Sequence, residues 1–78
     1  MKRLEFRIEY SFDVESGVVI ATMPELNHVS SFGQDFVEAE SNVMEAVLAY
    51  LEALQQDGLP LPEPTPATGT VLVVDLVA

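Results

Sequence analysis

The sequence predicts one α+β domain, residues 1–78, in which a single helix covers one face of a mixed four-stranded sheet in the order β-β-β-α-β. Three observations support this fold class. Alternating apolar residues open the chain, one long amphipathic segment lies in its middle, and a β-branched segment closes it. Since the sheet and the helix each have one apolar side, we expect two layers that bury those sides against each other.

The first strand is predicted from strict alternation of apolar and polar residues over residues 4–12. The apolar members are Leu4, Phe6, Ile8, Tyr10 and Phe12. A period of two residues places these side chains on one face, so the strand is expected to be half-buried. The segment 13–17 then favours a hairpin turn, because Asp and Ser bond nearby backbone groups and Gly17 tolerates positive φ.

Residues 18–23 are predicted to form the second strand. Their nearly continuous apolarity is typical of a strand that is covered on both faces or paired at an interface, and Pro24 ends it. Residues 24–36 are expected to form a long loop, because polar residues and glycine interrupt any apolar face. A short third strand, antiparallel to the second, is predicted around residues 36–39, and a start as early as Val29 remains open.

The helix is predicted to begin after Ser41 or Asn42 and to run for about four turns. Asn42 and Glu45 have the spacing of a capping box. At about 100° per residue, six apolar side chains share one face. They are Val43, Met44, Val47, Tyr50, Leu51 and Leu54. Gly58 is expected to be the left-handed carboxyl-terminal cap, and Pro60 prevents continuation.

Alternating prolines at positions 60, 62, 64 and 66 predict a stiff, extended arm that returns the chain along the sheet. The last strand is then predicted within residues 71–77. Its near-continuous apolarity favours a position beside the first strand and parallel to it, reached by a right-handed crossover through the helix.

Charge is the most informative bulk property of the chain. The net charge is −10, and the three basic residues, Lys2, Arg3 and Arg7, all lie at the amino end. No basic stripe is available to bind phosphates, so we expect no direct binding of nucleic acid. An acidic surface attracts a basic protein partner, or it serves only to keep a small protein soluble, and both interpretations remain open.

The chain has no cysteine and one histidine, so neither disulfides nor a conventional zinc cage is expected. No apolar run approaches the roughly 20 residues that span a bilayer, and no signal-peptide pattern opens the chain. These observations favour a cytoplasmic protein. Because so short a chain has a small core, we expect self-association, most simply as a twofold homodimer.

Catalytic chemistry is not predicted, so we expect a protein that is not an enzyme and that holds no metal or cofactor. Glu9, Asp13, Glu45 and Asp75 are the carboxylates that a two-metal nuclease site would require, but they fall on solvated faces or in turns. His28 lies in the predicted loop without an evident partner, as an exposed histidine does.

Candidate partner-binding residues fall into two classes. They are the carboxylates Asp13, Glu15, Glu45 and Glu52 and the aromatic residues Phe32 and Phe36. The carboxylates are expected to steer a basic protein, whereas an aromatic side chain buried at an interface anchors it. For the two aromatic residues, folding back onto the core remains an equally open alternative.

Two motifs carry a resemblance to a known family. Pro24, Glu25 and Leu26 follow the second strand, and residues 51–65 read LEALQQDGLPLPEPT. With the order of elements around them, these motifs resemble the HicB antitoxin family over residues 4–77. The resemblance implies a partial RNase H-like β-β-β-α-β domain. Asn27 and His28 stand where the family usually has Pro-Gly, and the loop before the predicted helix is about half a dozen residues longer than usual.

The resemblance also implies a partner, the small HicA toxin, which has a double-stranded-RNA-binding-like fold, cuts messenger RNA and must be basic to hold it. Complete HicB antitoxins carry a further DNA-binding segment, and the sequence stops at Ala78, so operator binding is not expected of this chain by itself. The alternative function is a homo-oligomeric structural or regulatory domain that has no toxin partner.

Overall fold

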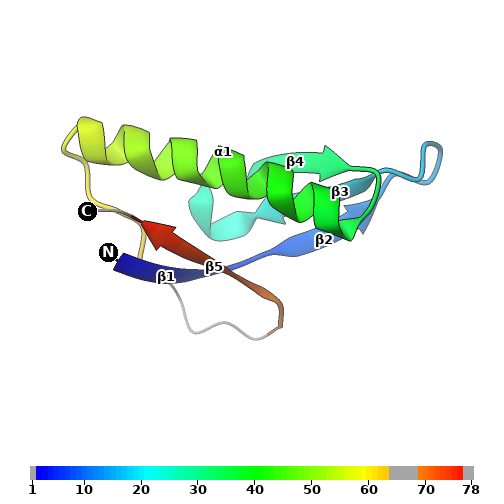
Figure 1. The fold of residues 1–78 in the computed structure, drawn as a ribbon, viewed down its shortest axis with the longest axis horizontal. Helices are drawn as coiled ribbons and strands as arrows, with labels where there is room; N and C mark the ends of the chain where they lie inside the picture. Colours follow the sequence, from blue (N-terminus) through cyan, green and yellow to red (C-terminus); the bar gives the residue numbers. More distant parts are fainter. Residues whose placement is uncertain (1, 64–68, 77–78) are drawn as a thin grey trace.

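The computed structural model describes residues 2–63 and 69–76. Its elements are β1 (Lys2–Arg7), β2 (Glu9–Phe12), β3 (Val19–Met23), the 3-10 turn η1 (Pro24–Leu26), β4 (Val29–Gly33), α1 (Phe36–Gln56) and β5 (Val71–Leu76). The fold is therefore α+β, as predicted, with one helix and small sheets of antiparallel strands. Figure 1 shows α1 lying along the long axis above the strands.

The predicted first strand is divided at Ile8, which gives two sheets of two and three strands instead of one sheet of four. Strand β1 pairs with β5, and β2 pairs with β3, which pairs with β4. The division follows from this change of partner. At the junction, the Ile8 amide donates to the Thr70 carbonyl at 3.0 Å, and the Arg7 amide donates to Glu25 Oε1 at 2.7 Å. Both amides thus keep a partner where the chain passes between sheets.

The prediction that the last strand is parallel to the first is wrong. Lys2 pairs with Leu76 and Arg7 with Val71, so β5 runs antiparallel to β1. The helix carries the chain to the end of the molecule where β1 begins (Figure 1). Thr70 lies next to Ile8 and Val71 pairs with Arg7, so β5 starts beside the other end of β1 and runs in the opposite direction. Part of the predicted proline arm, residues 64–68, lies outside the described residues.

The third strand and the helix both begin earlier than the preferred prediction. Val29–Gly33 forms β4, so the early start at Val29 is confirmed, whereas residues 36–39 are helical. The helix cap is Asp35, whose Oδ1 accepts from the Glu38 amide at 2.8 Å, while Glu38 Oε1 accepts from the Gln34 amide at 2.9 Å. The loop 24–36 was therefore predicted too long, and the extra loop length inferred for this chain rested on the wrong helix start.

Asn42 does not cap the helix, because it lies in the second helical turn. Its Nδ2 instead donates to the carbonyl of Phe32 at 2.8 Å, at the edge of β4. The predicted carboxyl-terminal cap is confirmed, since Gly58 has a φ of 67° and its amide donates to the Gln55 carbonyl at 3.1 Å. The turn at 13–17 is also confirmed, with the Asp13 amide donating to Val18 at 2.9 Å.

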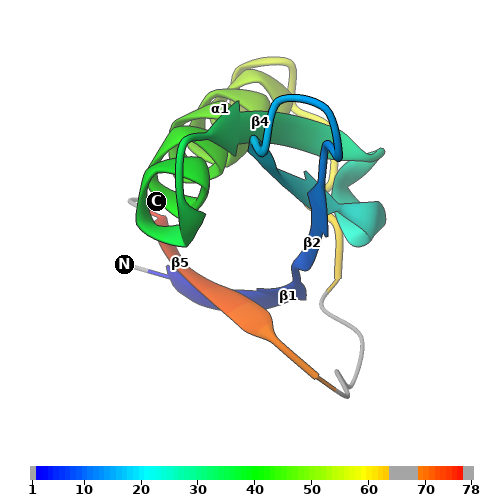
Figure 2. The same cartoon turned by 90° about the vertical axis from the view of Figure 1, so that its right-hand side faces the viewer.

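The core lies between α1, the three-stranded sheet and the β1–β5 ribbon, which curve around it in Figure 2. Val43, Val47 and Leu51 are fully buried, as predicted for the apolar helix face, and Met44, Tyr50 and Leu54 pack partly buried around them. The strands contribute Leu4, Phe6, Val19, Ala21, Met23, Leu72, Val74 and Leu76, and Ile8 is buried at the junction between β1 and β2. Within the described residues, no helix is long and apolar enough to cross a membrane.

Gly33 lies where the end of β4 meets the first turns of α1. A Cβ atom at this position would come against the backbone nitrogen of Ala39 and lie 2.8 Å from the carbonyl carbon of Glu38. Both obstacles are backbone atoms, so Gly33→Ala should force the strand and helix apart. We expect this substitution to lower the free energy of unfolding by about 2 kcal/mol, measured by urea denaturation. Ser30→Ala, on the same strand but exposed, should change it by less than about 0.5 kcal/mol, and equal effects would contradict this account.

Candidate protein-binding surfaces

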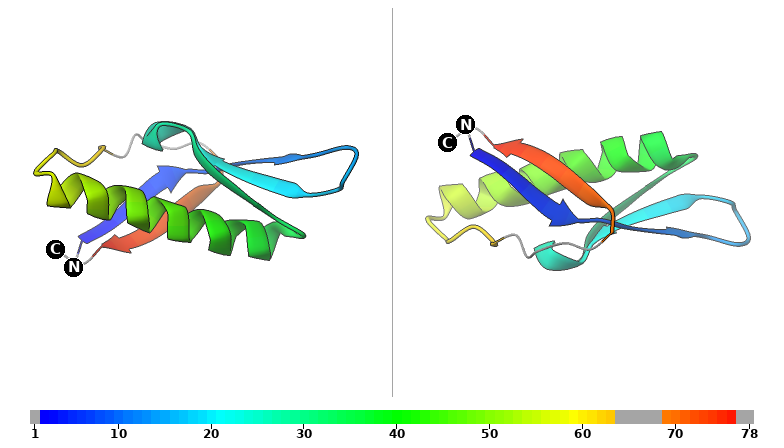
Figure 3. Two further views of the ribbon diagram at one scale, coloured as in Figure 1. Left: turned by 90° about the horizontal axis from the view of Figure 1, so that it is seen from above. Right: turned by 90° about the horizontal axis from the view of Figure 1, so that it is seen from below.

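The structure disperses the predicted partner-binding residues. Asp13 and Glu15 lie in the hairpin turn between β2 and β3, and Phe32 lies on β4. Phe36 is the first residue of α1. Glu45 and Glu52 are exposed on the solvent side of the helix, as expected, but far along it from the hairpin. Figure 3 shows the hairpin projecting past the amino end of α1. Only Asp13 and Phe32 border the same hollow.

An exposed aromatic cluster lies where β2 ends and α1 begins. We call it the aromatic end and define it as Tyr10, Phe12, Phe36 and Val37. The Phe36 ring meets Tyr10 and Phe12 edge to face, with centroids 5.1 and 5.4 Å apart. Phe12 is 59% exposed, Phe36 47% and Val37 79%. Such edge-to-face pairs stabilise the cluster by about 1 kcal/mol each. The cluster is therefore preorganised although it faces water.

Carboxylates adjoin the aromatic end. The Tyr10 hydroxyl donates to Glu40 Oε2 at 3.2 Å, and Glu40 lines a hollow of about 330 Å³ with Val37, Ser41 and Met44. Partial burial raises the pKa of Tyr10 above 10, and the negative charge and hydrogen bond of Glu40 raise it further. The surface thus combines apolar rings with a fixed negative charge, which suits a partner that presents both apolar and basic side chains.

Sequence reasoning found Phe36 but missed the other members of the aromatic end. Tyr10 and Phe12 continue the alternation of Leu4, Phe6 and Ile8, so they were predicted to face the core. Tyr10 does pack partly buried against the core, whereas Phe12, at the end of β2 next to the hairpin turn, is 59% exposed. The sequence signal for the exposure of Phe12 was its position next to the hairpin turn, because a small domain has few core residues near such a turn to cover a side chain.

The second surface is the side of the three-stranded sheet that faces away from α1. We call the part of it on and next to β3 and β4 the outer face, and its members are Val18, Ile20, Thr22, Ser30 and Phe32. On β3 these residues alternate with the buried Val19, Ala21 and Met23, which places them opposite the helix. Glu9 and Ser11 of the edge strand β2 lie on the same side of the sheet, opposite Thr22 and Ile20. Phe32 is 65% exposed. No member of the outer face is ionisable, in a chain whose net charge is −10.

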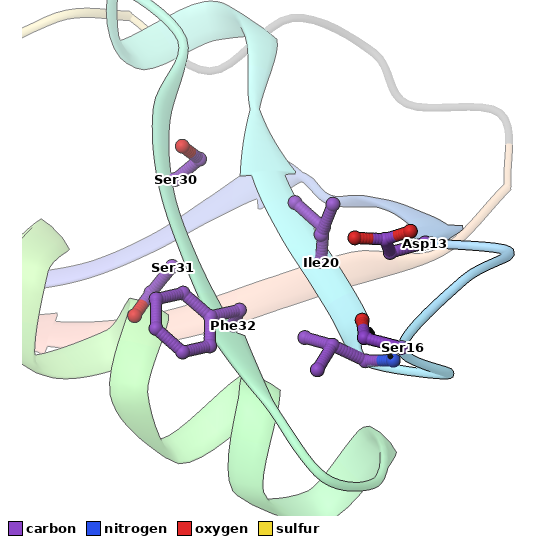
Figure 4. A pocket seen from close by; sticks show the side chains of 7 residues that line it. Asp13, Ser16, Ile20, Ser30, Ser31 and Phe32 are labelled. Atoms are coloured by element: carbon purple, nitrogen blue, oxygen red, sulfur yellow. Dashed lines mark hydrogen bonds between the residues drawn. The ribbon is translucent and has the colours of Figure 1, made fainter.

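A hollow of about 550 Å³ opens beside Phe32 on the outer face. Val18 and Ile20 contribute apolar side chains to its lining, and Asp13, Ser16 and Ser30 contribute polar atoms. Figure 4 shows the labelled lining residues around the hollow. Asp13 is held in place by the hairpin turn, since its Oδ1 accepts from the Glu15 amide at 3.0 Å. The arrangement places an exposed aromatic ring and a concave apolar surface next to each other on one face.

The carboxylates considered for metal binding are not brought together. Asp75 forms an ion pair with Arg3 at 3.0 Å across the β1–β5 ribbon, and Glu9 lies 3.5 Å from Arg7. Asp13 and Glu45 lie on the hairpin turn and the helix. Among residues 2–63 and 69–76, no group of three potential ligands is positioned to hold a metal ion. His28 is exposed in the turn after η1, where it has a φ of 57°.

Comparisons of this chain with protein-family models, with curated proteins and with solved structures give no match. The resemblance to the HicB family rests on the sequence motifs alone.

The pKa of the Tyr10 hydroxyl tests whether the contact between Tyr10 and Glu40 at the aromatic end forms in solution. In a Tyr50→Phe background, which leaves Tyr10 as the only tyrosine, Glu40→Gln should lower the pKa of Tyr10 toward 10, because the nearby negative charge is removed. The titration is followed by phenolate absorbance. Glu45→Gln, farther along the helix, is the control and should leave the pKa unchanged. Equal shifts in both variants would mean that the Tyr10–Glu40 contact does not form in solution.

The same shift has a consequence for stability. The folded protein favours the neutral phenol of Tyr10, because its pKa is raised on folding. This contribution is fully present below the unfolded-state pKa of about 10 and is lost as the pH rises through the folded-state value. The unfolding midpoint in urea should therefore fall more steeply above pH 10 in the Tyr50→Phe protein than in a Tyr10→Phe/Tyr50→Phe variant. Identical pH dependence in the two proteins would contradict the assignment.

Proposed function

We propose that this chain is a non-catalytic, cytoplasmic binding domain of the HicB type, which neutralises a small basic protein that cleaves messenger RNA. The observation that carries the proposal is the aromatic end, an exposed and preorganised aromatic cluster adjoined by carboxylates in a chain of net charge −10. Exposed apolar clusters with a polar border are typical of protein interaction sites.

The charge distribution supports a basic partner. Two of the three cations are already engaged within the described residues, Arg3 with Asp75 and Arg7 with Glu9. The helix carries exposed glutamates at positions 38, 40, 45 and 52 and has no basic residue. A basic protein is therefore attracted from a distance of about one Debye length, roughly 8–10 Å, before any contact forms.

The order of elements supports the choice of family. Counting β1 and β2 as one strand gives the order β-β-β-α-β that the resemblance implies, although the strands form two sheets and β5 runs antiparallel to β1. The motif at residues 51–65 spans the last turns of α1, the cap at Gly58 and the first part of the proline-rich segment. A motif that coincides with a helix end and its cap has a structural reason to recur in related domains.

A homo-oligomeric domain without a toxin is the second candidate function. The outer face favours it, because another copy can cover its apolar residues and the exposed Phe32 while Glu9 and Asp13 stay at the border of the contact. The two candidates thus depend on different surfaces of the molecule.

The proposal is tested with the product of any small basic reading frame next to the gene for this chain. Mixing the two proteins should give a stable complex and stop messenger RNA cleavage at equimolar amounts, and rising salt should weaken the complex. A basic neighbour whose cleavage activity is unaffected by excess of this chain would overturn the toxin-neutralising role.

Association and dissociation rates of that complex should distinguish the long-range attraction by the helix glutamates from the contact made by the Phe36 ring. The double variant Glu45→Lys/Glu52→Lys should slow association, and more at low salt than at high salt, because rim charges act through the long-range field. Phe36→Ala should instead speed dissociation, with a loss of about 2 kcal/mol if the ring is a hot spot. Both rates are measured by surface plasmon resonance.

Phe32→Ala is the matched control for the Phe36 variant, because it removes an exposed ring of the same type from the opposite side of the sheet. It should leave both rate constants unchanged. Faster dissociation with Phe32→Ala and not with Phe36→Ala would place the anchor on the outer face.

A further inference from the structure

We propose that the outer face is a self-association surface, on which a second copy of this chain packs about a twofold axis and each Phe32 enters the hollow of the other copy. This inference rests on the second candidate function and deepens it, because it names the residues and the packing of the self-association surface and requires no foreign protein.

Self-complementarity is the first ground for this assignment. In a twofold interface the same patch serves both copies, so any group that protrudes must find its recess on that same patch. Phe32 protrudes from β4, with 65% of its surface exposed, and its ring borders the hollow that Val18, Ile20 and Asp13 also line. The outer face therefore carries both halves of a reciprocal contact. The aromatic ring is large enough to fill part of an opening of about 550 Å³.

The low charge of the outer face is the second ground. It favours a second copy of this chain, and not a basic protein, as the occupant of this face. The five members of the outer face are uncharged, and the nearest carboxylates on its border belong to β2 and the hairpin, at Glu9 and Asp13. A second copy can thus cover the centre of this face without burying a charge, which would cost several kcal/mol per ion. A basic protein gains no charge pairing at the centre, whereas the aromatic end offers it Glu40.

The size of the face limits the strength of association. Three strands of about five residues span roughly 250 Å² in projection, well below the approximately 800 Å² per partner of a standard stable complex. The dimer is therefore expected to be weak. Because each copy carries a net charge of −10, salt screens their repulsion and should tighten the dimer. This salt response is opposite to that of a complex with a basic protein.

Sedimentation equilibrium of the purified chain, from about 20 µM to about 1 mM, tests the association in the concentration range where a weak dimer forms. The apparent mass should rise from 8.5 kDa toward twice that value, and the rise should be larger at high salt. Phe32→Ser should weaken the dimer at least tenfold. Val37→Ser, which removes an even more exposed apolar residue from the aromatic end, is the matched control and should leave it unchanged.

A second measurement locates the interface without altering the phenylalanine. The chain has no cysteine, so a single introduced cysteine is a unique label. A short bismaleimide should link Ser30→Cys, on the outer face, into a covalent dimer much faster than Ala49→Cys, on the exposed side of the helix. Both variants change an exposed residue, and circular dichroism verifies that all variants remain folded.

Three results would overturn the inference. They are a monomer at every concentration and salt, an equal loss of association in Phe32→Ser and Val37→Ser, and equal linking rates for the two cysteine variants. All of these measurements use the isolated chain. Their failure would therefore leave the proposed binding of a basic protein untouched, and failure to bind such a protein would leave the dimer untouched.

Discussion

The contact between Gly33 and the first turns of α1 is the constraint on which both surfaces depend. Because Gly33 has no side chain, the end of β4 can approach the backbone of Ala39, and only two residues separate strand from helix. This approach fixes the helix rotation, with Ala39, Val43 and Val47 facing the core at four-residue intervals. Phe36 and Val37 are then left outside the core, where Phe36 meets Tyr10 and Phe12.

Features that depend on local periodicity could be predicted from the sequence. The buried helix face, the hairpin turn and the cap at Gly58 each follow from a repeat or from turn chemistry within a few residues. The helix start could not, because Asp35 and Glu38 have the same spacing as Asn42 and Glu45. Which pair caps the helix is decided by the contact at Gly33, which local sequence does not reveal. The direction of β5 likewise depends on a long-range contact, because β5 starts where Thr70 lies next to Ile8 and Val71 pairs with Arg7.

The candidate surfaces were predicted only in part, because the side on which a residue lies also depends on where the strands and the helix begin and end. Phe32 and Phe36 were both expected as anchors, but four residues apart they end on opposite sides of the sheet, since one belongs to a strand and the other to a helix. Tyr10 and Phe12 follow the alternation of the core residues before them. Alternation tells which side of a strand a residue faces, whereas its burial depends on how far the covering layer extends.

The placement of the two surfaces on opposite sides of one thin sheet has a consequence for how the protein works. The aromatic end lies on the side of α1, and the outer face lies on the other side, so covering one leaves the other accessible. A dimer formed through the outer face would therefore carry two aromatic ends directed away from the interface. Two sites on one dimer raise the apparent affinity for an assembled or repeated partner without any new contact. Self-association through the outer face and partner binding at the aromatic end would then be compatible.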